Sequence, residues 1–76
     1  MNNKRRMLLK KAIATLDSAS DYVNTVLEEE QDSLDNMPEN LEGSDRYVKM
    51  ETAVEKLEEA IEQIDSAKEC LEEASE

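Results

Sequence analysis

Apolar residues recur every three or four positions along two stretches of the chain, and a short segment holding its only proline and only glycine separates them. This spacing puts apolar side chains along one side of a helix, whereas a half-buried strand would alternate every second residue. We therefore expect helices at about residues 3–36 and 45–74, joined by a turn at residues 37–44. The predicted fold is all-α, with residues 1–76 forming a single antiparallel helical hairpin of coiled-coil type.

Both predicted helices follow a seven-residue repeat, in which apolar positions a and d form the contact between paired helices. With Ile13 and Tyr47 each placed at a, three of these seam positions are polar: Ser20, Glu30 and Lys68. A polar seam residue can fix register or oligomeric state, and a lysine can also extend its charge to solvent. The full seam is Leu9, Ile13, Leu16, Ser20, Val23, Leu27, Glu30, Leu34 and Met37, then Tyr47, Met50, Val54, Leu57, Ile61, Ile64, Lys68 and Leu71.

The segment "NMPENLEGSDRY" has the residues of a structural turn. Met37 precedes a proline and so disfavours helix, and Pro38 suits the first position of a new helical turn. Gly43 can adopt the left-handed conformation that ends such a turn, and Ser44 is a good N-cap for the second helix. Leu41 is the one apolar residue free to fold back against the seam.

Antiparallel pairing of a with d positions predicts the register of the hairpin. It sets Met37 opposite Tyr47, Leu27 opposite Leu57 and Ser20 opposite Ile64. The same register brings the basic start of the chain to its acidic end, with two lysines near three glutamates: Lys10, Lys11, Glu72, Glu73 and Glu76.

Alanine recurs every seven residues at position g, beside the seam. The row is Ala12 and Ala19, followed by Val26 and Ser33, in the first helix, and Ala53, Ala60, Ala67 and Ala74 in the second. One interpretation is that alanine is simply a good helix former. The other is a close contact with a third and a fourth helix, because small side chains let helices approach. A hairpin alone leaves this flank exposed to solvent. We therefore predict a homodimer that forms a four-helix bundle, or a bundle completed by another protein.

The formal net charge of −11 is unevenly distributed: residues 1–11 carry five basic residues and no acid, and the rest of the chain is strongly acidic. Such a chain is repelled by nucleic acids and anionic membranes, so nucleic acid and membrane are not expected as partners. Only the basic tip, where Arg5 and Arg6 lie, could contact phosphates. High charge with few aromatic residues is also typical of disorder, but the regular heptads indicate a folded helix.

The sequence offers little chemistry. There is no histidine, which removes the commonest general base and metal ligand. Cys70 at position c is expected to be a surface thiol, and the acidic clusters lack the spacing of a calcium loop. We predict no catalytic, cofactor-binding or metal-binding residue, and no enzyme. A single cysteine fits a cytoplasmic protein, and the apolar run of "KRRMLLKKA" is too short for a signal peptide.

The segment "LDNMPENLEGSDRYVKMETAVEKLEEAIEQIDSAKECLEEA", residues 34–74, resembles a group of small acidic helical-hairpin proteins of unknown function from gut bacteria and their phages or mobile elements. The shared features are the Asn-Met/Leu-Pro-Glu turn and the Leu-Glu-x-Ala repeats. The resemblance implies a phage- or mobile-element accessory protein and gives no functional residues.

Two functions compete. The first is a non-enzymatic protein–protein interaction or structural module, which binds an unknown protein partner through its acidic surface or through Glu39 and Asn40 of the turn. The alternative is a small nucleic-acid-binding hairpin that uses Arg5 and Arg6 of the basic tip.

Overall fold

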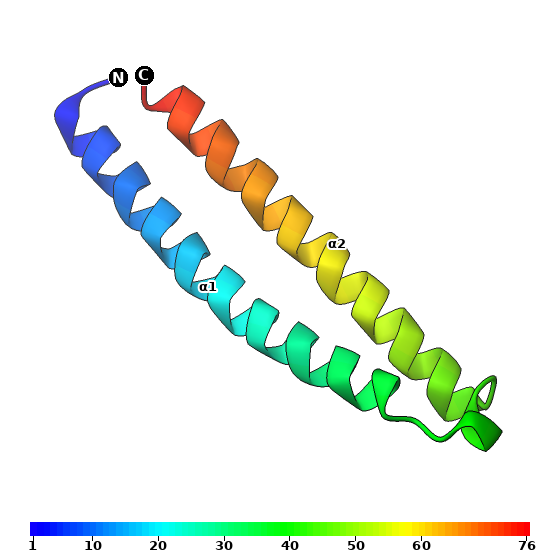
Figure 1. Cartoon of the computed structure of the whole chain (residues 1–76). Coiled ribbons are helices and arrows are strands. Elements are labelled where there is room, and N and C mark those ends of the chain that lie inside the picture. The colour runs from blue at the N-terminus through cyan, green and yellow to red at the C-terminus, as the bar shows by residue number, and fades with distance from the viewer.

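The computed structural model describes residues 1–76 as two long antiparallel helices joined by a short turn (Figure 1). Helix α1 spans Asn3–Asp35 and α2 spans Asp45–Ala74, with a 3₁₀ helix, η1, at Glu39–Leu41 between them. The molecule is a rod of 59 × 15 × 13 Å. Both chain ends lie at one end of the rod and the turn lies at the other (Figure 1). The predicted all-α hairpin is confirmed.

Side-chain caps define where the two helices begin. The side chain of Asn2 accepts a hydrogen bond from the backbone N–H of Arg5 at 2.8 Å. The hydroxyl of Ser44 accepts one from the backbone N–H of Tyr47 at 3.2 Å, as the sequence predicts. Each bond satisfies an amide that has no partner within its helix.

The turn follows the predicted order of stop, short helical turn, cap and restart. Helix α1 ends at Asp35, two residues before Met37, and Gly43 takes a left-handed φ of +82°. Two details differ from the expectation. Pro38 is the cap of η1, with an extended ψ of 142°, rather than its first helical residue. Leu41, the last residue of η1, does not fold back as a plug but stays exposed.

Every seam position predicted at a or d is buried or half-buried. Only Val54 and Ser20 are buried, each 7% exposed, and no side chain is fully buried. A compact monomer of this 8.7 kDa mass would expose about 4,700 Å², whereas this chain exposes 5821 Å². Two helices alone therefore leave a large share of their surface in water.

One contact between the helices fits the predicted register. The register sets Lys68 opposite Leu16, and Lys68 bonds the next residue along, Asp17. Near the chain ends, the Arg6 guanidinium donates to the backbone carbonyl of Ser75 at 3.0 Å. The expected pairing of basic and acidic ends is not made by ion pairs: neither Lys10 nor Lys11 pairs with a glutamate. Lys11, at position f, faces directly away from α2.

Candidate interaction surface

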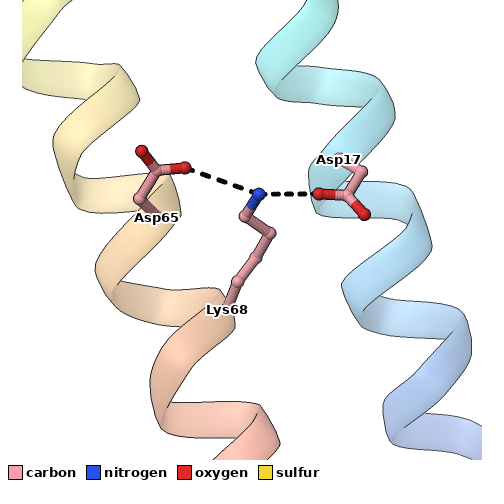
Figure 2. Close-up of polar contacts among 3 residues, drawn as sticks. All are labelled: Asp17, Asp65 and Lys68. Atoms are coloured by element: carbon pink, nitrogen blue, oxygen red, sulfur yellow. Dashed lines mark hydrogen bonds and ion pairs between the residues drawn. The ribbon is translucent and has the colours of Figure 1, made fainter.

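The one group of ion pairs that joins the two helices is centred on Lys68 (Figure 2). Its ammonium lies 2.6 Å from an Asp17 oxygen on α1 and 3.4 Å from an Asp65 oxygen on its own helix. The pKa of Lys68 is raised, chiefly by the hydrogen bond to Asp17; desolvation acts against it, and the charge of Asp17 together with the hydrogen bond and charge of Asp65 adds to the rise. The lysine stem thus lies in the seam while its charge reaches the rim.

This cluster establishes how the two flanks of the seam are arranged. Asp17 and Asp65 both occupy position e, and one lysine in the seam reaches both (Figure 2). The e positions of the two helices therefore border the same side of the seam. Since g lies across the seam from e, the g positions of both helices border the other side. The alanine rows of α1 and α2 consequently belong to one face of the hairpin.

Charge is fully segregated around α2. All of its acids occupy positions b, e and f, and all of its bases occupy a, c and g. We call the acid-bearing side the acidic face; its members are Asp45, Glu51, Glu55, Glu58, Glu59, Glu62, Asp65, Glu69, Glu72 and Glu73. With like charges repeated along the 59 Å rod, this surface carries a strong negative potential.

The opposite side, which we call the alanine face, comprises positions c and g of both helices. From α1 it contains Arg5, Leu8, Ala12, Thr15, Ala19, Tyr22, Val26, Glu29 and Ser33. From α2 it contains Arg46, Lys49, Ala53, Lys56, Ala60, Gln63, Ala67, Cys70 and Ala74. Glu29 is its only acid. Its small side chains are flanked by three large exposed apolar ones: Tyr22 is 76% exposed, Leu8 56% and Val26 46%.

The basic tip forms a second surface feature. Lys4, Met7, Leu8 and Lys11 line a shallow depression of about 400 Å³ on α1. Met7 is 62% exposed there, and neither lysine forms an ion pair within the chain. The tip can therefore offer positive charge beside apolar surface to a ligand.

The four residues predicted as interaction candidates do not come together. Glu39 and Asn40 are exposed in η1. The two arginines lie in the first turn of α1, which begins at the end of the rod away from the turn (Figure 1). Arg5 is exposed and forms no ion pair. Arg6 is half-buried, and its side chain is engaged by Ser75 and Asn3. Arg5 is thus the more available of the two arginines.

The remaining chemical features are few. No three acidic or cysteine side chains converge in a group that could hold a metal ion. The Cys70 thiol is exposed. Neither helix combines the length and the apolar character needed to cross a bilayer.

Sequence reasoning missed Asp17 and the place of the exposed apolar residues Leu8 and Tyr22 on the alanine face. Asp17 could have been found, because it is an acidic e position one residue from the position opposite Lys68. Leu8 and Tyr22 occupy position c, outside the seam and the alanine row, so the heptad pattern gave no reason to single them out.

No protein-family model matches this chain, and neither a curated protein nor a solved structure shows a significant match to it.

Proposed function

We propose that the chain is a non-enzymatic interaction module that works as a homodimer, with two hairpins packed through their alanine faces into a four-helix bundle. The observation that carries this proposal is the charge segregation around α2. Pairing through the alanine face covers small and apolar side chains and leaves both acidic faces in water. Pairing through the acidic faces would set like charges against each other, which is unfavourable.

The exposed area supports this arrangement. The chain exposes 5821 Å², roughly 1,100 Å² more than a compact monomer of its mass. A stable interface covers about 800 Å² on each partner. The surplus surface is thus of the size that one hairpin would cover on another.

Sedimentation equilibrium tests the dimer. Wild type is expected at twice its 8.7 kDa mass at micromolar concentration. Ala60→Glu, which puts a charge in the middle of the alanine face, should give monomers. The matched control is Ser66→Glu, which adds the same side chain on the acidic face and should leave the dimer intact. A wild-type monomer that is stably folded would refute the proposal.

The acidic faces, which point outward in such a dimer, are proposed to bind a basic surface of another protein, including one that otherwise holds DNA. An accessory protein of a phage or mobile element, acting in the cytoplasm, would fit this role. Low-salt crosslinking in native lysate tests it. Wild type should capture a partner that a Glu55→Gln, Glu62→Gln, Glu69→Gln variant loses. Capture of nothing but the chain itself would count against the role.

Nucleic-acid binding through the basic tip remains the second candidate, because its exposed cations are not engaged within the chain. Gel retardation with RNA and duplex DNA tests it, using Lys4→Glu with Arg5→Glu, since Arg6 is already bonded to Ser75. Binding that weakens with salt and disappears in this variant would support the tip. Unchanged binding would exclude it.

A further inference from the structure

We propose that the two hairpins stack with their turns at the same end of the bundle, so that α1 of each copy packs on α2 of the other. This inference rests on the dimer proposed above and specifies how it is built. It follows from the different side chains that the two helices contribute to the alanine face.

Size complementarity favours this stacking. On the alanine face the large exposed side chains Leu8, Tyr22 and Val26 all belong to α1. Position g of α2 carries only alanine from residue 53 to residue 74. Large side chains pack well into the holes between small ones. A contact between two copies of α1 would instead bring the large side chains of both copies to the same pair of helices. Helix α1 of one copy therefore fits best against α2 of the other.

Symmetry then fixes the relative orientation of the two hairpins. Two rods packed face to face can be related by a two-fold axis along their length or by one across their width. The axis across the width stacks α1 on α1 and α2 on α2, with the turns at opposite ends. The axis along the length stacks α1 on α2 and keeps both turns at the same end. Size complementarity thus selects the axis along the length.

The position of each residue along the rod also brings opposite charges of the two copies together. Within the hairpin, Lys68 lies level with Asp17, and an axis along the rod preserves such levels between copies. Glu29 lies twelve residues after Asp17 on α1, and Lys56 lies twelve residues before Lys68 on α2. Glu29 is therefore level with Lys56 on α2 of the other copy. Glu29 is the only acid on the alanine face, and Lys56 is held only by an exposed ion pair with Glu59. The symmetry creates this contact twice.

The opposite arrangement lacks such a match. Stacking α2 on α2 brings Arg46, Lys49 and Lys56 over a helix that has no acid at positions c or g. In that arrangement, no register of the two helices gives these cations an acidic partner on the other α2.

Distances between spin labels distinguish the two arrangements. The probe is Asn40→Cys in a Cys70→Ser background, which places one label in the exposed turn of each copy. Turns at the same end predict a label separation below about 35 Å, because neighbouring helix axes in a bundle are ~8–10 Å apart. Turns at opposite ends predict a separation close to the 59 Å length of the rod.

The outcomes separate this inference from the dimer itself. A short distance supports it. A long distance in a sample that sediments as a dimer overturns the stacking and leaves the dimer standing. A monomeric mass with no dipolar coupling overturns both. Circular dichroism of the labelled protein confirms that the helices are retained.

Charge reversal provides an independent test. Glu29→Lys should weaken dimerisation by about tenfold, because two exposed ion pairs become repulsive, and adding Lys56→Glu should restore it. The matched control is Glu28→Lys, which makes the same change at position b on the opposite side. Failure of the double variant to recover, with Glu28→Lys equally weakened, would contradict the proposed pairing.

Discussion

The ammonium of Lys68 and the carboxylate of Asp17, on opposite helices, lie 2.6 Å apart at the rim of the seam. Lys68 breaks the apolar repeat, yet its polar end reaches the e positions rather than the core. The contact locates the e flanks of both helices on one side. It thereby assigns both alanine rows to the other side, on which the proposed dimer depends.

This contact predicts a loss of stability in alkali. The folded state raises the pKa of Lys68, chiefly through Asp17, and that of Tyr47, chiefly through desolvation and then through nearby acids. A raised pKa means that the folded chain holds the proton more tightly than the unfolded chain. Both contributions are therefore complete below pH 10 and are lost as the pH rises through the folded pKa values.

Chemical denaturation between pH 8 and pH 12 measures this effect. The free energy of unfolding should be level near pH 8 and fall above the ordinary pKa values of 10.0 for Tyr47 and 10.5 for Lys68. Lys68→Met and Tyr47→Phe should each reduce the fall. A stability that rises with pH across this window would contradict the assignment.

The cap of α2 makes a measurable contribution. Ser44→Ala removes the hydroxyl that accepts from the Tyr47 amide and should cost about 1 kcal/mol in the free energy of unfolding. Ser44→Asp should retain most of it. Urea unfolding measures both, with Ser18→Ala at an exposed position of α1 as the control. Equal stability of Ser44→Ala and wild type would show that the cap is not formed.

The turn needs glycine for its backbone rather than for space. Gly43 has a φ of +82°, and a Cβ added there would meet nothing within 4 Å. Gly43→Ala should therefore cost ~1–2 kcal/mol through conformational strain alone, and Gly43→Asn should cost less because asparagine tolerates this region. A neutral Gly43→Ala variant would mean that the turn adopts another conformation.

Apolar residues in the seam and in the turn should respond differently to truncation. Val54 is only 7% exposed, so Val54→Ala should destabilise the protein by about 2 kcal/mol. Leu41 is 43% exposed, and Leu41→Ser should change stability by less than about 0.5 kcal/mol. Thermal unfolding compares the two. A large loss in Leu41→Ser would restore the idea that this side chain plugs the end of the seam.

The hairpin itself could be predicted from the sequence, because its determinants are local or periodic. The heptads specify the seam, and Gly43 and Ser44 specify how the turn ends and how α2 begins. The position of Leu41 could not be derived, since an apolar residue in a short turn can face either way. The acidic partners of Lys68 could not be derived either, because a flexible lysine can extend to several acids. The candidates Glu39 and Asn40 followed from their place in the predicted turn, and Arg5 and Arg6 from the basic start of the chain. Neither observation shows that Arg6 is engaged within the chain.

The central claim is that the alanine face is covered by a second copy, so folding and association are linked. The most direct measurement is the unfolding midpoint, followed by circular dichroism, at chain concentrations from 1 to 100 µM, since mass action makes a dimer's midpoint depend on concentration. We predict a midpoint that rises by several degrees across this range for wild type and stays constant for Ala60→Glu. A wild-type midpoint that is independent of concentration, in a protein that sediments as a monomer, would contradict the account.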